Sequence, residues 1–173
     1  RSAQVIGASY STLDVDDMTL DASDAQVRLR MTEMIRSVKP DVVITHDPND
    51  YHPDHVETSK LVFHCMVMAN LVHVKTQSEP LAHPFMVYYM DMVGGGLFVP
   101  TEYVDVTQTF ERKIEALSCH VSQVDYLRRS TGLHVIHATE VLAEYRGLQC
   151  GCRYAEGFRA CDKRAVPPYR LLP

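Results

Sequence analysis

Histidines and carboxylates gather in the stretch from Asp47 to His55, which reads Asp-Pro-Asn-Asp-Tyr-His-Pro-Asp-His. His52 and His55 are three residues apart, so both imidazoles can face one side if a helix begins at Pro53. A hydrolytic zinc site needs imidazole or carboxylate ligands, and nearby groups that stabilise the oxyanion formed during hydrolysis. We therefore interpret the stretch as a candidate metal-dependent hydrolytic site. The alternative is that the two histidines only cap a helix or close a turn.

The flanking sequence places this stretch between a strand and a helix. The run from Asp41 to His46 is short, β-branched and followed closely by a proline, which predicts a strand buried on both faces. From Val56 to Asn70 the chain has no Gly or Pro. Apolar residues recur there at helical spacing, at Leu61, Val62, Cys65, Met66 and Ala69. Open α/β sheets bind ligands where strands end and such helices begin, so this position favours a functional site.

The same residues resemble a known family. The His-Pro-Asp-His run from His52 to His55, preceded by the Pro-Asp-Val-Val run at Pro40, resembles the second motif of the PIG-L/LmbE zinc-dependent N-acetylglucosaminyl deacetylases. Three later stretches are also similar to that family: Tyr103 to Val106, His120 to Gln123, and Tyr154 to Phe158. The resemblance implies the C-terminal part of a Rossmann-like α/β fold, with a mostly parallel sheet and helices on both faces. It also implies an amidohydrolase that removes an acyl group from an N-acylated amino sugar or glycoconjugate.

The resemblance implies roles for single residues as well. It makes His55 a ligand of Zn²⁺ or of another divalent transition metal. It makes His52 a catalytic residue that stabilises the oxyanion in its protonated form, and Asp54 the carboxylate that holds His52 in that form. Three residues are expected to contact the substrate: Tyr51, Arg1 and Asp17. For the first of these a packing role is the alternative, and for the second an exposed, frayed end.

The family's first motif, Ala-His-Pro-Asp-Asp-Glu, has no counterpart in this sequence. In the family it supplies a His and an Asp ligand and the Asp that acts as general base. His55 would then be the only metal ligand here, and we expect the remaining ligands to come from a missing N-terminal segment or a companion chain. Two classes of function stay open: a deacetylase completed in this way, or a non-catalytic sugar-binding or assembly subunit that holds no metal by itself. A serine hydrolase is disfavoured, because the sequence has no Gly-x-Ser-x-Gly signature.

Composition narrows the class of protein further. With 173 residues, 46% of them hydrophobic, we expect a single deacetylase-like domain over residues 1–173, incomplete at its N-terminus. A net charge of −5 without a basic stripe argues against a nucleic-acid partner, and no apolar run is long enough to predict a membrane span. Five cysteines, an odd number, favour a reducing compartment, so we expect a cytoplasmic protein. The family resemblance adds a homo-oligomer as an expectation.

The remaining chain is predicted to alternate strands and helices. Strands are predicted over residues 12–15, 85–90 and 103–106. Three further helices are predicted: one capped at Ser23 and ending near Val38, one capped at Thr107 and ending at Gly132, and one from Ala138 to Leu148 that buries Val141, Leu142 and Tyr145. The glycines at 94–96 predict a mobile loop, and the prolines at 167–168 an irregular tail. Cys150 and Cys152 form a Cys-x-Cys pair without a second pair to complete a structural zinc set, and we interpret them as ordinary thiols.

Overall fold

A computed structural model describes residues 1–94 and 96–163 of the chain. Its contacts divide the chain into two compact units: unit 1 comprises residues 1–12 and 93–158, and unit 2 comprises residues 13–92 and the chain from Arg159 onward. The predicted loop at 94–96 lies partly, and the prolines at 167–168 wholly, outside the described residues. Within the described ranges no helix is both long enough and apolar enough to cross a membrane.

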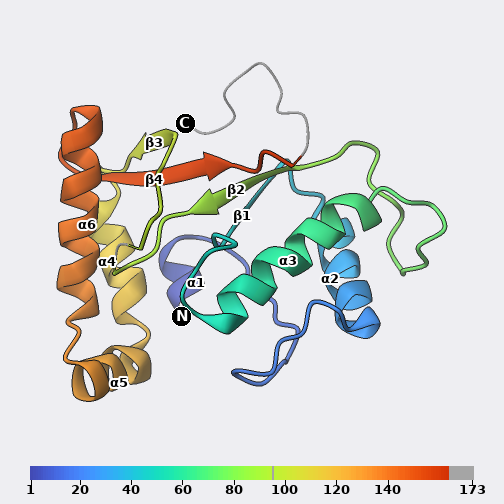
Figure 1. Ribbon diagram of the computed structural model, residues 1–173, viewed down its shortest axis with the longest axis horizontal. Helices are drawn as coiled ribbons and strands as arrows, with labels where there is room; N and C mark the ends of the chain where they lie inside the picture. Colours follow the sequence, from blue (N-terminus) through green and yellow to red (C-terminus); the bar gives the residue numbers. More distant parts are fainter. Residues whose placement is uncertain (95, 164–173) are drawn as a thin grey trace. The chain divides into compact units, whose positions relative to one another are not determined.

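Unit 2 contains two parallel strands and two helices (Figure 1). Strands β1 (Val42–Thr45) and β2 (Met86–Met90) pair in register, with Val43 opposite Val87 and Thr45 opposite Tyr89. Helix α3 (Pro53–Met68) connects them, as parallel strands require a crossover, and it packs against α2 (Ala25–Val38). The strands and helices predicted around the Asp47–His55 stretch are thereby confirmed.

The residue that caps the start of helix α2 lies one position later than predicted. The side chain of Asp24, not Ser23, accepts hydrogen bonds from the backbone N–H groups of Gln26 (2.7 Å) and Val27 (3.3 Å). The helix ends as predicted at Val38, followed by Lys39 in the left-handed conformation.

The strand predicted over residues 12–15 is wrong: this segment is irregular, and Asp14 has a φ of 48°, which no extended strand accommodates.

The strand β1 is not buried on both faces as predicted, since Ile44 is 47% exposed. Within unit 2, β1 pairs with β2 alone among the described residues, so β1 lies at an edge. In contrast, β2 has a neighbour on each side, because the N–H of Cys161, just beyond β4, donates to the carbonyl of Val87. The middle residues of β2 are buried accordingly.

Unit 1 joins two antiparallel strands to four helices. Strand β3 (Glu102–Asp105) pairs with β4 (Ala155–Ala160), whose last two residues belong to unit 2. The helices are α1 (Ser2–Val5), α4 (Phe110–Ser118), α5 (Val121–Thr131) and α6 (Val135–Cys150). The α/β class is confirmed, with one parallel and one antiparallel strand pair in the described sheet. The predicted helix up to Gly132 is two helices, α4 and α5, although Gly132 ends the second with a φ of 72°.

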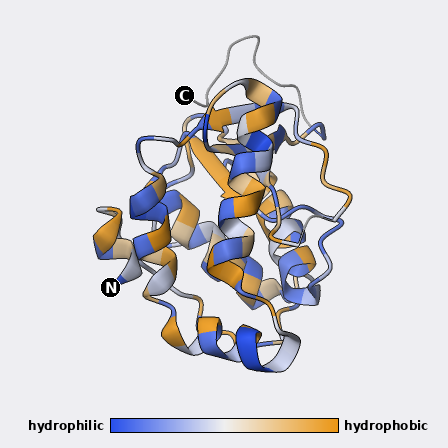
Figure 2. Ribbon diagram, turned by 90° about the vertical axis from the view of Figure 1, so that its left-hand side faces the viewer, coloured by the Kyte–Doolittle hydropathy of each residue, from blue (hydrophilic) through white to orange (hydrophobic). Residues whose placement is uncertain are grey.

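Helix α6 buries a different face from the predicted one. Val141 and Tyr145 are 48% and 53% exposed, whereas small and polar side chains face inward, namely Thr139, Ala143, Arg146 and Gly147. A Cβ at Gly147 would lie 2.6 Å from the carbonyl oxygens of Cys152 and Arg153, so this position of the face requires glycine. Figure 2 shows hydrophobic and hydrophilic residues mixed along the helices, and the apolar spacing of α6 therefore predicted the wrong face.

A buried arginine fixes the end of α3 and the loop that follows it. Arg36 is 1% exposed and lies on α2. Its guanidinium donates to the carbonyls of Met68 and Ala69, two of the last carbonyls of α3 that have no partner within the helix. It also donates to four acceptors in the loop: the carbonyls of Leu71, Val74 and Ser78, and the hydroxyl of Thr76. Arg36 therefore holds α3, and with it the candidate site, against α2.

Candidate metal and catalytic site

The site forms in the turn between β1 and α3. Asp47, two residues beyond β1, accepts hydrogen bonds from the backbone N–H of Asn49 through its side chain (2.8 Å) and from that of Asp50 through its carbonyl (3.0 Å). The buried carboxylate of Asp47 also pairs with the guanidinium of Arg159, which lies over the ring of Tyr89. A buried carboxylate that is paired and hydrogen-bonded is stable in place, so Asp47 shapes the turn that presents the next residues.

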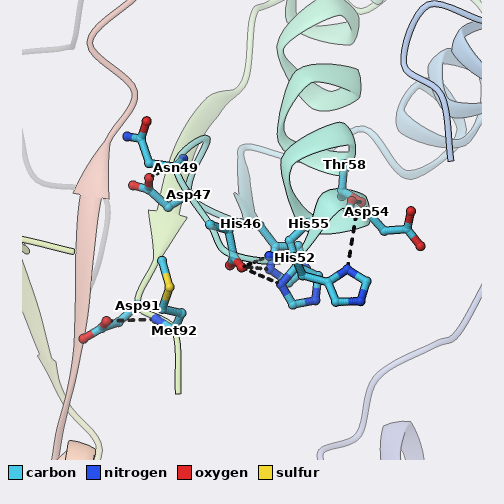
Figure 3. Close-up of polar contacts among 10 residues, drawn as sticks. His46, Asp47, Asn49, His52, Asp54, His55, Thr58, Asp91 and Met92 are labelled. Carbon is cyan, nitrogen blue, oxygen red and sulfur yellow. Dashed lines mark hydrogen bonds and ion pairs between the residues drawn. The ribbon is translucent and has the colours of Figure 1, made fainter. Parts of the chain in front are cut away.

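Three side chains of this turn form one cluster: His46, Asp50 and His55. One potential ligand atom from each lies within 4.8 Å of the other two. The Asp50 carboxylate is 2% exposed and lies 3.1 Å from Nδ1 of His55 and 3.8 Å from Nδ1 of His46. The two imidazole rings stack, with centroids 3.8 Å apart, and each is about one-third exposed or less. Figure 3 shows the histidines gathered at the start of α3.

The donor atoms of this cluster suit a divalent metal ion. Nδ1 of His55 is buried and has no hydrogen-bond partner among the residues described, because its close contact with Asp50 lacks hydrogen-bond geometry. A buried ring nitrogen in this state is what a bound cation would satisfy. Burial, helped by the charge of His55 and opposed by Asp50, lowers the pKa of His46 to about 4. His46 is thus neutral near pH 7, the form in which imidazole ligates a metal.

His52 caps helix α3 beside this cluster. Its Nδ1 accepts a hydrogen bond from the backbone N–H of Asp54 (3.2 Å), while its own backbone N–H donates to Asp50 (3.0 Å). A backbone N–H can only donate, so Nδ1 of His52 carries a lone pair and the proton of the neutral ring is on Nε2. The ring centroid lies 4.7 Å from that of His55. The site therefore contains a neutral histidine whose Nε2–H can donate a hydrogen bond without prior protonation.

Asp54 supports His52 in a different way from the expected carboxylate–imidazole contact. It contacts His52 through its backbone N–H, and its carboxylate accepts a hydrogen bond from the backbone N–H of Met18 (2.7 Å). Figure 3 shows the carboxylate of Asp54 pointing away from the imidazoles. Met18 has a φ of 64°, a costly conformation for a residue with a side chain. Asp54 thus ties the irregular segment around Met18 to the first turn of α3.

The other predicted site residues differ in whether they lie near the histidines. Tyr51 is 73% exposed, and its ring meets those of His52 and His55 edge-on, at 6.1 and 5.9 Å. Asp17 is exposed and precedes Met18 in the turn that Asp54 holds. Arg1 belongs to unit 1, where it is exposed at the start of α1. Within unit 2 the structure therefore brings Tyr51, His52 and His55 together.

Sequence reasoning missed two members of the cluster, His46 and Asp50. His46 was assigned to the end of a strand, and Asp50 to a generally acidic turn. The available signal was the spacing His46-x3-Asp50-x4-His55, which spans a strand end, a turn and the first turn of a helix. No single periodicity brings these three positions together, so only the fold of the turn does.

The sequence of this chain is similar to those of several known proteins. Residues 1–66 match the family described as PIG-L, GlcNAc-PI de-N-acetylase. A diacetylchitobiose deacetylase from Thermococcus kodakarensis is 27% identical over 177 residues, covering 92% of this chain and 59% of that protein. A 4-oxalmesaconate hydratase from Pseudomonas putida is 24% identical over 124 residues, covering 70% of this chain and 48% of that protein.

This chain is also similar in fold to a solved structure. The N,N'-diacetylchitobiose deacetylase from Pyrococcus horikoshii, in complex with its inhibitor MPG, is similar with a TM-score of 0.74 at 25% identity. The similarity covers 92% of this chain and 60% of that one. The chain therefore spans about three fifths of the length of these deacetylases and about half of that of the hydratase.

Proposed function

We propose that this chain belongs to the PIG-L family, which it matches over residues 1–66, and that it acts as a metal-dependent deacetylase on an N-acylated amino sugar. The observation that carries the proposal is the cluster of His46, Asp50 and His55 at the start of α3. Two imidazoles and a carboxylate are the ligand set of several hydrolytic zinc enzymes. Two of the deacetylases among the relatives act, by name, on diacetylchitobiose, which favours an N-acetylated sugar as substrate.

We assign the metal to these three side chains, with His55 as the ligand that the sequence already indicated. Zinc is the proposed ion, since imidazole with carboxylate is its usual catalytic environment. When bound, zinc supplies Lewis-acid polarisation of the acyl carbonyl and activation of water. The buried carboxylate of Asp50 contributes negative charge beside both histidines and so favours a cation at this point.

His52 is the proposed oxyanion donor. Hydrolysis of an amide builds negative charge on the carbonyl oxygen, and a hydrogen bond aimed at that oxygen stabilises the transition state more than the ground state. The backbone N–H of Asp54 keeps the proton of neutral His52 on Nε2, so that this nitrogen can donate. Asp54 is a positioning residue in this proposal, because it acts through His52 and through the segment at Met18.

Tyr51 is the proposed contact for the sugar. Its ring is exposed and lies edge-on to His52 and His55, where it can offer an apolar face and a hydroxyl to a sugar ring. Asp17, in the turn before Met18, is a second proposed substrate contact, and Arg1 a third. These assignments rest on exposure and chemical type.

The decisive experiment measures release of a primary amine and of acetate from N,N'-diacetylchitobiose and N-acetylglucosamine, using the natural protein that carries this chain. Zinc removal by a chelator is expected to abolish the activity, and zinc addition to restore it. His52→Ala is expected to lower kcat by about 100-fold with zinc affinity unchanged, because the lost donor acts in the transition state. Val72→Ala, at an exposed position of the same unit, is the matched control.

The similarity to a hydratase supplies the competing reaction. The 4-oxalmesaconate hydratase relative covers a larger share of this chain than the family match does, so 4-oxalmesaconate is assayed beside the acetylated sugars. Hydration of that acid without any amine release would overturn the deacetylase proposal. Neither activity, together with no bound zinc, would instead support the alternative of a non-catalytic subunit.

A further inference from the structure

Two thiols meet at the end of helix α6. Cys150 is the last residue of the helix, Gly151 follows with a φ of 83°, and Cys152 lies in the turn that leads to β4. In a continuous helix, residues two positions apart point to nearly opposite sides and do not face each other. Because the helix ends at Gly151, the Sγ atoms of Cys150 and Cys152 lie 3.6 Å apart.

The turn that brings the thiols together is held by its backbone. The carbonyl of Gly147 accepts hydrogen bonds from the N–H groups of Gly151 (2.8 Å) and Cys152 (3.0 Å). Gly147 also lets this turn pack directly on the helix, since any Cβ there would meet the carbonyl oxygens of Cys152 and Arg153 at 2.6 Å. The backbone hydrogen bonds and the packing at Gly147 therefore hold the two sulfur atoms close together. Their short distance does not require an interaction between the sulfur atoms themselves.

We propose that Cys150 and Cys152 form a reversible intrachain disulfide, which makes this turn a redox modification site for small-molecule disulfides. The thiolate of Cys150 attacks one sulfur of the small disulfide, which forms a mixed disulfide and releases one small thiolate. The thiolate of Cys152 then attacks the sulfur of Cys150 and releases the second small thiolate. The protein loses two protons and two electrons, and the small disulfide gains both as two thiols.

The surroundings of the two thiols give them different roles. Cys150 is exposed, whereas Cys152 is partly covered and donates to the carbonyl of Tyr154 (3.3 Å). Burial, together with Cys150 and Asp105, raises the pKa of Cys152 to about 11. The thiolate, not the thiol, is the attacking species, so Cys150 reacts first with the small disulfide and Cys152 resolves the mixed disulfide.

The other three cysteines provide the controls. Cys65 and Cys161 are 0% and 2% exposed, so a small disulfide cannot reach them in the folded chain. Cys119, the residue that caps the end of α4, is partly exposed, and among the described residues no thiol contacts it. A reaction governed by exposure alone would include Cys119, whereas a reaction governed by the thiol pair is confined to the turn after α6.

The test treats the folded, reduced chain with oxidised glutathione, quenches it with acid, alkylates it with N-ethylmaleimide in denaturant so that buried thiols also react, and maps the modified peptides by mass. Before alkylation, the mass of the treated chain is expected to be lower than that of the reduced chain by two hydrogen atoms. After alkylation, we expect two of the five thiols to remain unmodified and the disulfide to lie in the peptide that contains Cys150 and Cys152. Dithiothreitol is expected to restore both thiols. Cys119→Ser is expected to react like the native chain.

Single variants test the order of the two steps. Cys152→Ser is expected to accumulate glutathione on Cys150, because no thiol remains to resolve the mixed disulfide. Cys150→Ser is expected to react more slowly, since the remaining thiol is partly covered and donates to the carbonyl of Tyr154. Five alkylated thiols in the treated native chain, or a disulfide that involves Cys119, would overturn the proposal.

Discussion

The imidazole rings of His46 and His55 stack face to face, with centroids 3.8 Å apart and planes 8° from parallel. One ring follows the end of β1 and the other belongs to the first turn of α3, so the stack joins the two elements that define the turn. The buried carboxylate of Asp50 contacts both rings. This arrangement fixes three potential ligand atoms before any ion binds, which reduces the cost of ordering the ligands on binding.

His55→Ala is expected to weaken zinc binding by about 100-fold or more, because it removes a ligand and the stacking partner of His46. His46→Ala is expected to have a similar effect. The affinity is measured by competition with a chromophoric chelator. His73→Ala removes an exposed histidine of the same unit and serves as the matched control. An unchanged zinc affinity in both cluster variants would show that the cluster is not the metal site.

Asp54→Ala is expected to release the segment around Met18, because the hydrogen bond from the Met18 N–H to the carboxylate is lost. Charge-assisted hydrogen bonds of this kind contribute about 1 kcal/mol at a partly exposed position. Amide hydrogen exchange resolves the effect residue by residue, and protection of the Met18 amide should fall.

The reciprocal control for this experiment lies one helical turn further on. The carboxylate of Glu57 accepts from the N–H of Ala22 (2.9 Å), so Glu57→Ala is expected to expose the Ala22 amide and leave that of Met18 protected. If both variants exposed both amides equally, Asp54 would have only a general effect on stability.

Arg36→Lys is expected to lower the free energy of unfolding by about 3 kcal/mol, because a lysine cannot satisfy the buried carbonyls that the planar guanidinium serves. Urea denaturation measures the change. Arg112→Lys, at an exposed position of α4, should change it by less than about 0.5 kcal/mol. Equal effects of the two substitutions would contradict the clamp that we assign to Arg36.

Glu33→Gln is expected to make stability less sensitive to acid. Hydrogen bonds from the backbone N–H (2.9 Å) and the hydroxyl (2.7 Å) of Ser78 lower the pKa of Glu33 from its ordinary value of 4.5. Because the folded-state pKa is the lower one, ionised Glu33 stabilises the fold above pH 4.5, and this contribution is lost as the pH falls through the folded-state pKa.

The measurement for Glu33 is the free energy of unfolding from about pH 6 down to about pH 3. The slope should be shallower in Glu33→Gln, and also, to a smaller extent, in Ser78→Ala, which removes the hydroxyl donor but keeps the backbone donor. Identical slopes in the native chain and Glu33→Gln would disprove the linkage.

The sequence by itself determined the elements that follow one another closely along the chain. The β-branched run before Pro48 and the apolar spacing after Pro53 specified β1 and α3, because strand and helix periodicities are local properties. The His-Pro-Asp-His run at His52 likewise identified the stretch where the site lies. Gly132 ended a helix as predicted, since its left-handed conformation suits glycine.

Only the tertiary structure decided which side chains meet. The cluster of His46, Asp50 and His55 joins three local conformations, and the spacing of its members matches no single period. The face of α6 was decided by the turn that packs on Gly147, and the target of the Asp54 carboxylate by a segment more than thirty residues earlier in the chain. Such contacts depend on how distant segments pack, which a local pattern of residue types does not encode.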